Sequence, residues 1–167
     1  MTKEEFLQTV KPRDVIVLQG VPGSGKSTMA QGIKDRFPSY TQIFSADHGM
    51  VFQGLYTFQP WKLGKCHKDC FRSFLDVLDD TELVGNNSIL IVDNTNTTNI
   101  EIAPYIAAAS AYNRECYLVT INIPLETAIK RQVHGVPASK ISTMAKRIEN
   151  SIKTMPSYWK HFEVEGE

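Results

Sequence analysis

Gly20-Val21-Pro22-Gly23-Ser24-Gly25-Lys26-Ser27-Thr28 is the stretch of this 167-residue chain that decides its fold. The nine residues fit the phosphate-loop pattern G-x-x-x-x-G-K-[ST] at every fixed position. Glycines allow a turn so tight that successive backbone N–H groups face one anion. The Lys26 ammonium is expected at the β- and γ-phosphates, and the Ser27 hydroxyl can ligate Mg²⁺. All nine residues are therefore predicted to bind a nucleoside triphosphate.

The residues on either side of this loop support the interpretation. Residues 14–19 form a short apolar run of the strand type, and residues 26–37 have the pattern of a helix. The N-terminus of that helix would face the phosphates, where its unpaired N–H groups attract an anion. A chance match in a glycine-rich turn is the alternative, and a strand before the loop with a helix after it argues against that alternative.

Strand and helix patterns alternate along the rest of the chain. Further strands are expected at 40–45, 88–92 and 115–122; helices at 61–83, 99–112, 125–133 and 139–155; an irregular segment at 47–60; and a turn at 85–87. This alternation predicts an α/β fold with a parallel sheet covered by helices on both faces. We expect one domain over residues 1–167, with short polar ends at about 1–13 and 156–167.

Composition excludes several classes of protein. The chain is 42% hydrophobic and 22% charged, which argues against disorder and fibrous repeats. No apolar run approaches the 18 residues of a membrane span, and the polar N-terminus lacks a signal-peptide core, so we expect a cytoplasmic protein with no membrane partner. The motif Cys66-His67-x-x-Cys70 has no second ligand pair, and no zinc is expected there.

Charge is neutral overall but uneven along the chain. The sequence carries 18 basic and 18 acidic residues, yet the charged residues are mostly basic at 62–72 and all acidic at 76–82. A local basic face for nucleic acid and an ordinary solvated helix face both fit this pattern. The preceding segment is rich in aromatic residues, which either stack on bases or bury the loop against the core. They are Phe52, Tyr56, Phe58 and Trp61.

Two aspartates are expected beside the phosphate loop. Asp47 and Asp93 each follow a predicted strand, and the carboxyl ends of parallel strands meet at one edge of the sheet. Asp47 is suited to orient an acceptor hydroxyl in phosphoryl transfer, or else to cap a turn. Asp93 resembles the Walker-B aspartate that helps to hold Mg²⁺ together with Ser27. No glutamate stands beside Asp93, which disfavours a hydrolytic motor.

Two further groups of side chains are candidates for ligand binding. Asn94, Thr95 and Asn96 follow Asp93, and such short polar residues suit either a ligand or the N-cap of the next helix. Arg131 precedes a flexible stretch around Gly135. It is placed either to close over phosphates as part of a lid, or to act as a surface cation at a helix C-terminus.

Several motifs together resemble a known family. The phosphate loop, FSAD at 44–47, VDNTN at 92–96, KRQVHGVP at 130–137 and KISTMAKRIE at 140–149 resemble the polynucleotide 5′-hydroxyl kinase family of P-loop kinases. The resemblance implies a P-loop kinase fold with a small helical lid, and it implies ATP and Mg²⁺ as cofactors.

The resemblance also implies roles for individual residues. Asp47 matches the general base, Lys26 and Arg131 match catalytic cations, and the 94–96 run matches the polar motif after the third strand. His67 matches a histidine on the helix after the substrate loop. The chain departs from the family at His48 and Met50, where an acidic residue and a substrate-binding arginine are typical.

These features favour one function among three. The leading hypothesis is an ATP-dependent kinase that phosphorylates the 5′-hydroxyl of DNA or RNA. Zero net charge and Met50 favour instead a kinase of a nucleoside, a modified base hydroxyl or another small alcohol. A nucleotide-binding module without transfer activity is the third, and intact Lys26, Ser27 and Asp47 argue against it.

Overall fold

Strands and helices alternate through most of the structure, as the sequence pattern predicts. The structure is a computed structural model and describes residues 1–80 and 87–166. In chain order its elements are α1 (Lys3–Thr9), β1 (Val15–Gln19), α2 (Lys26–Arg36), β2 (Thr41–Phe44), η1 (Ala46–Met50), β3 (Val51–Phe52), β4 (Leu55–Tyr56), η2 (Pro60–Lys62), α3 (Leu63–Asp79), β5 (Ile89–Asp93), α4 (Asn99–Ala111), β6 (Cys116–Asn122), α5 (Leu125–Arg131), α6 (Ala138–Thr154) and β7 (Lys160–Glu165).

Five of the strands form one parallel sheet. Its strand order is β2-β5-β1-β6-β7, with β1 in the centre. The chain leaves β1 toward one edge of the sheet and later returns across β1 to build the other edge. The carboxyl ends of the strands on the two sides of such a reversal splay apart and leave a crevice for a ligand. The loop after β1, which carries the phosphate-loop motif, opens into this crevice.

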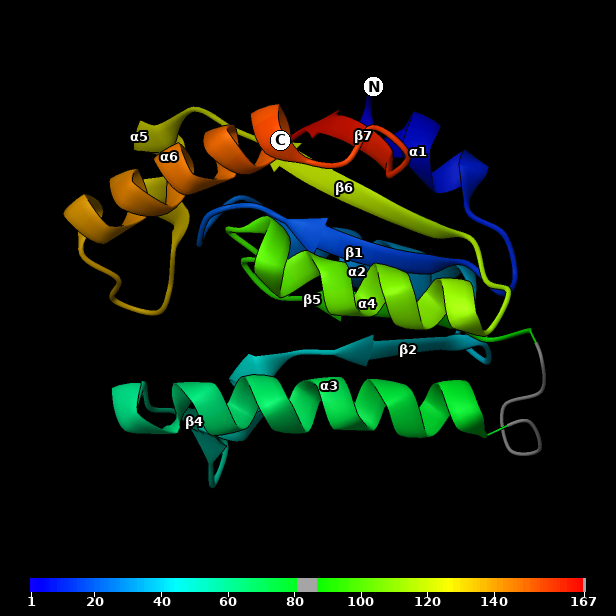
Figure 1. Cartoon of the computed structure of the whole chain (residues 1–167). Helices are drawn as coiled ribbons and strands as arrows, with labels where there is room; N and C mark the ends of the chain where they lie inside the picture. The colour runs from blue at the N-terminus through cyan, green and yellow to red at the C-terminus, as the bar shows by residue number, and fades with distance from the viewer. Residues whose placement is uncertain (81–86, 167) are drawn as a thin grey trace.

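Two helical layers cover the two faces of the sheet (Figure 1). Side chains alternate across a strand, so Val15 and Val17 pack with α3 and α4, while Ile16 and Leu18 pack with α1 and α2. Every residue of β1 and β5 is buried. This explains why both strands are continuous apolar runs rather than alternating ones. The predicted α/β sheet with helices on both faces is confirmed.

The ends of the chain differ from the expectation of short polar ends. Residues 3–9 form α1, which begins with a capping box in which Thr2 and Glu5 exchange hydrogen bonds of 2.7 and 3.2 Å. Residues 160–165 form β7, which pairs in parallel with β6. Phe6 packs against Phe162, with ring centroids 5.7 Å apart. Each element is too short to show a clear hydrophobic period, and each becomes stable only against the sheet.

The bounds of the other predicted elements agree with the structure to within two residues, with one exception. The helix expected at 61–83 is the 3₁₀ turn η2 followed by α3, which ends at Asp79. Residues 81–86, where the rest of that helix and most of the predicted turn fall, lie outside the described residues. Of the helices described, none has the length and apolar character that a membrane span requires.

The segment expected to be irregular contains two small elements. It begins with the 3₁₀ helix η1 and continues into an antiparallel hairpin of β3 and β4. Gln53 and Gly54 occupy the hairpin turn with positive φ angles of 50° and 79°. Beyond β6, helices α5 and α6 pack on each other and on Val21 of the phosphate loop. They form the small helical lid that the sequence predicted.

Candidate nucleotide-binding and phosphotransfer site

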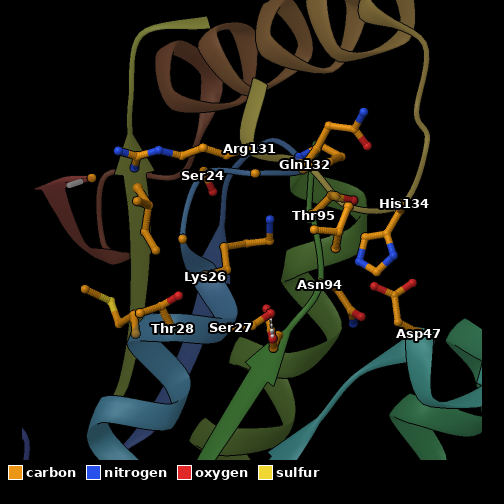
Figure 2. Close-up of a pocket in the computed structure, with 18 of the residues that line it drawn as sticks. Ser24, Lys26, Ser27, Thr28, Asp47, Asn94, Thr95, Arg131, Gln132 and His134 are labelled. Carbon is orange, nitrogen blue, oxygen red and sulfur yellow. Dashed lines mark hydrogen bonds between the residues drawn. The ribbon is translucent and has the colours of Figure 1, made fainter. Parts of the chain in front are cut away.

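A cavity of about 350 Å³ lies at the carboxyl ends of the strands. Its volume is in the range of small-molecule binding sites. Most of the residues proposed from the sequence line it: Pro22, Gly23, Ser24, Gly25, Lys26, Ser27, Thr28, Asp47, Asp93, Asn94, Thr95 and Arg131. Figure 2 shows Lys26 and Asp47 on opposite sides of this cavity, with Asn94 and Thr95 between them. The phosphate loop, Asp47 and Asp93 thus meet at one edge, as expected.

Backbone geometry explains two glycines of the phosphate loop. Gly25 has φ +97° and is the N-cap of α2, with no side chain capping the first turn, so the N–H groups there face the cavity. Gly23 has φ +81°, and a Cβ atom on it would lie 2.2 Å from the carbonyl oxygen of Ala128 in α5. Gly23 therefore lets the loop and the lid pack backbone against backbone.

Lys26 is a buried cation, and none of the carboxylates in residues 1–80 and 87–166 lies within hydrogen-bond range of it. Its Nζ donates to the carbonyl oxygen of Val21 at 2.9 Å, and the residue is 9% exposed. Burial lowers the pKa of Lys26 to about 8, although the nearby carboxylates of Asp93 and Asp47 act in the opposite direction. A phosphate group in the cavity would stabilise the ammonium, so the loop is electrostatically prepared for an anion.

Ser24 supplies a second sign that a ligand belongs here. Its hydroxyl is buried and has no hydrogen-bond partner among the described residues, although it lines the cavity. Buried hydroxyl groups are seldom left unpaired, because desolvation costs about 1–3 kcal/mol. A phosphate oxygen would accept its hydrogen bond. The loop therefore fits a nucleoside triphosphate.

Ser27 and Asp93 form a pair suited to Mg²⁺. The Ser27 hydroxyl donates to Oδ2 of Asp93 at 2.7 Å, across the gap between α2 and β5. Asp93 is buried at the end of β5, so its carboxylate is held by the strand rather than by a loop. A hydroxyl and a carboxylate are hard oxygen donors, which Mg²⁺ prefers. In P-loop proteins these two residue types hold the ion next to the phosphates.

Asp47 is exposed at the start of η1, directly after β2. The N-cap of η1 is Ser45, whose hydroxyl accepts a hydrogen bond from the Asp47 backbone N–H at 3.2 Å. Capping is thus performed by a neighbour, and the Asp47 carboxylate faces the cavity. Its Oδ1 accepts a long hydrogen bond of 3.4 Å from the Tyr56 hydroxyl, and burial together with Asp47 raises the pKa of Tyr56 to about 12.

Asn94 positions the backbone next to Asp47. Its Oδ1 accepts from the Ala46 N–H at 2.8 Å, and its Nδ2 donates to Sγ of Cys70 at 3.6 Å. The Tyr105 hydroxyl donates to the same sulfur at 3.5 Å. Cys70 is therefore a buried acceptor that orients the Asn94 amide. This chain of contacts connects α3 and α4 to the turn that carries Asp47.

The rest of the polar run divides between the cavity and the interior. Thr95 lines the cavity, and its carbonyl oxygen accepts from the Gly20 N–H at 3.2 Å. Asn96 is buried outside the lining, with φ +46°, and its Nδ2 donates to the carbonyl oxygen of Leu18 at 2.7 Å. Thr98 caps α4 in a capping box with Glu101. Capping of α4 is thus performed by Thr98, two residues beyond this run, and ligand binding by Asn94 and Thr95 stays a prediction.

Three other residues singled out in the sequence also lie away from the cavity. Gly20 and Val21 border a neighbouring hollow next to α6 instead. His67 is half-buried on α3 and does not line the cavity. The binding role expected of these residues and of Asn96 stays a prediction, and direct contact with a ligand in this cavity finds no support in their placement.

Four consecutive residues of the lid, from position 131 to 134, line the cavity. Arg131 is the last residue of α5, and His134 follows in the α5–α6 loop (Figure 2). The His134 ring lies against the Tyr56 ring with centroids 4.1 Å apart. Gln132 braces the loop by accepting a hydrogen bond from the Val136 N–H at 3.0 Å. The lid therefore reaches the hairpin through His134, while Arg131 lines the same cavity as Asp47 with its side chain directed away from Asp47 (Figure 2).

Sequence reasoning missed part of the lining. Unforeseen lining residues are Lys3, Met29, Ile121, Gln132, Val133, Glu165 and Gly166. Lys3 lies on α1 and Glu165 on β7, two elements that the sequence pattern did not predict. No local motif marks a residue that only tertiary packing brings to the site. Met50, at the position where the resemblance expects a substrate-binding arginine, is 4% exposed and packs in the core. His48 is exposed.

Comparison with known families identifies this architecture. The AAA_33 family, described as an AAA domain, matches residues 15–150, from the start of β1 almost to the end of α6. The chain belongs to this family. NEDD4-binding protein 2 of Homo sapiens is 28% identical over 150 residues, which are 83% of this chain and 8% of that protein. YLP motif-containing protein 1 of Homo sapiens is 24% identical over 165 residues, 86% of this chain and again 8% of the relative.

Solved structures show the same fold. A chain of the Pnkp1/Rnl/Hen1 RNA repair complex superposes with a TM-score of 0.67 at 18% identity, covering 89% of this chain and 48% of that one. A gluconokinase from Sinorhizobium meliloti 1021 gives 0.60 at 14% identity, covering 94% and 85%. Kti12 of Chaetomium thermophilum, solved with ADP-AlF3, gives 0.56 at 16% identity, covering 89% and 88%. This AAA_33 domain thus has a P-loop kinase-like fold.

Proposed function

We propose that this AAA_33 domain is an ATP-dependent kinase that transfers the γ-phosphoryl group to the 5′-hydroxyl of a polynucleotide. The observation that carries the proposal is the exposed carboxylate of Asp47 across the cavity from Lys26. A phosphate loop alone binds nucleotide. A carboxylate on the far side of the same cavity adds a group that can accept the proton of an attacking hydroxyl.

The geometry of the site supports a role for each residue. Lys26 and the N–H groups at the start of α2 bind the phosphates, and Arg131 adds positive charge from the lid. Because the transition state of phosphoryl transfer is loose, such charge neutralisation supplies most of the catalysis. Ser27 and Asp93 would hold Mg²⁺, which supplies further neutralisation of phosphate charge when bound. Tyr56 and Asn94 orient the turn of Asp47.

Two likenesses support a polynucleotide acceptor. The motif combination of FSAD, VDNTN and HGV resembles the polynucleotide 5′-hydroxyl kinase family. The superposition on a chain of an RNA repair complex has a TM-score of 0.67. Burial of Met50 instead favours a smaller acceptor, because the position of the family's substrate-binding arginine is turned into the core. A nucleoside or another small alcohol is therefore the second candidate.

The test is transfer of label from γ-labelled ATP, with Mg²⁺, to 5′-hydroxyl DNA and RNA oligonucleotides and to free nucleosides. Asp47→Asn is expected to lower transfer by about 10²- to 10⁴-fold, the usual contribution of a general base, with near wild-type affinity for ATP. Asp35→Asn, which changes an exposed carboxylate of α2 away from the cavity, is the matched control. Label only on nucleosides would replace the polynucleotide by the second candidate. Equal loss of ATP binding and transfer in Asp47→Asn would contradict the role of this residue.

A further inference from the structure

The segment that follows Asp47 exposes large apolar side chains that a folded domain ordinarily buries. Leu55 is 71% exposed, Phe58 46% and Trp61 78%. They lie on β4, in the loop after it, and on η2. The alternative considered for these aromatic residues, burial of the loop against the core, is therefore wrong for Phe58 and Trp61. Exposed aromatic side chains clustered in one segment are typical of a surface that binds a ligand or a partner molecule.

Basic side chains border these aromatic residues. Lys62 ends η2, and Lys65, Lys68 and Arg72 follow on α3 at spacings of three and four residues, which places them on one exposed face of the helix. The opposite face, with Cys66, Cys70, Phe74 and Leu78, is buried in the core. Asp69 is the one acidic residue between positions 51 and 75, and it pairs with Lys65.

We call Phe58, Trp61, Lys62, Lys68 and Arg72 the basic aromatic ridge. It is physically continuous with the turn that carries Asp47. The same segment contains Tyr56, whose hydroxyl bonds to Asp47, and the Thr57 N–H donates to the carbonyl oxygen of Met50 at 2.9 Å. At the start of α3, Cys66 packs so closely on Gly49 that a Cβ there would lie 2.7 Å from its sulfur.

We propose that this ridge binds the single-stranded chain whose 5′ end enters the cavity. Unpaired bases stack on Trp61 and Phe58, and the phosphates that follow contact Lys62, Lys68 and Arg72. Stacking requires the faces of the bases to be free, which a duplex does not allow, whereas aromatic side chains interleaved with cations suit a single strand of any sequence. The proposal rests on the proposed function, because it assigns the substrate of the same site. It also accounts for affinity in a chain of zero net charge, since the basic residues are concentrated on one surface.

The experiment measures binding without ATP, so that it does not depend on catalysis. Fluorescence anisotropy follows a labelled 5′-hydroxyl single strand of about ten nucleotides, a length within the site sizes of single-strand binders. Trp61→Ala is expected to weaken binding by about 10- to 100-fold, and Trp61→Phe to restore most of it. Tyr158→Ala is the matched control, because Tyr158 is 80% exposed but borders a hollow beside α4, away from the cavity. It is expected to bind like wild type.

Salt dependence provides a second readout. Lys68→Ala is expected to reduce the slope of log affinity against log salt by about 0.7, the share of one phosphate contact on a single strand. Equal binding by Trp61→Ala and Tyr158→Ala would overturn the proposal, as would preference for a blunt duplex. Trp61-dependent capture of a protein with no oligonucleotide binding would also overturn it. Trp61-dependent binding without label transfer to any oligonucleotide would support the ridge and contradict the proposed kinase, so the two failures are distinguishable.

Discussion

Replacing Lys26 by methionine is expected to stabilise the nucleotide-free protein at neutral pH. The pKa of Lys26 is about 8 in the folded protein, against an ordinary value of 10.5, because burial disfavours the ammonium. A difference of about 2.5 pKa units corresponds to about 3 kcal/mol. Methionine has a similar length and no charge, and the carbonyl oxygen of Val21 keeps its second hydrogen bond, from the Ser24 N–H at 3.1 Å.

The pH dependence of this effect has a defined sign. Between pH 8 and 10.5 the unfolded chain holds a proton on Lys26 that the folded chain has released, so wild-type stability rises with pH through this window. Below pH 8 both states are protonated, and the folded state bears the full cost of the buried ammonium. We therefore expect Lys26→Met to exceed the wild type by about 3 kcal/mol at pH 7, and the excess to disappear as the pH approaches 10.5.

Urea denaturation of the nucleotide-free protein between pH 7 and 10 measures the difference, with the fluorescence of Trp61 and Trp159 as the signal. Lys34→Met is the control, because Lys34 is exposed on the same helix and its replacement should leave stability almost unchanged at every pH. A variant less stable than wild type at pH 7 would refute the reasoning, as would an excess that is the same at pH 7 and pH 10. Either result would mean that burial of the Lys26 ammonium does not lower the free energy of unfolding.

Three further substitutions test the loop and the base. Gly23→Ala is expected to lower the free energy of unfolding by more than about 2 kcal/mol in urea denaturation, because it adds a 2.2 Å contact with the Ala128 carbonyl oxygen to an unfavourable φ. Gly25→Ala is the control, because it adds only the unfavourable φ, which costs about 1 kcal/mol. Equal losses in the two variants would contradict the packing of the loop on the lid. Tyr56→Phe is expected to slow phosphoryl transfer about fivefold through loss of one long hydrogen bond to Asp47, with ATP affinity unchanged; an unaltered rate would remove Tyr56 from the positioning of the base.

Much of the fold could be predicted because its signals are local. The strands 15–19 and 89–93 are buried on both faces, so each is a continuous apolar run with β-branched residues that a reader of the sequence can identify. The ends could not be predicted in the same way. Seven residues of α1 and six of β7 are too few for a period to stand out, and the Phe6–Phe162 contact joins the two elements.

The same distinction between local signals and tertiary contacts applies to the candidate site. Asp47 and Asp93 follow strands of a parallel sheet, so their meeting at one edge follows from topology alone. Asn96 stands two residues after Asn94 and has the same side chain, yet the left-handed backbone at Asn96 turns its amide to the carbonyl oxygen of Leu18. Only the path of the chain separates the two asparagines, and composition cannot show it.

Residue types and their spacing are enough to predict a phosphate loop, an α/β sheet behind it, and carboxylates at the edge where phosphate would bind. These features depend on residue type and on spacing within single elements. Tertiary structure alone decided that Met50 is buried, that Trp61 is exposed, and that His134 meets Tyr56 across the cavity. These outcomes depend on which distant segments compete for the same surface, and that competition is settled only when the whole core packs.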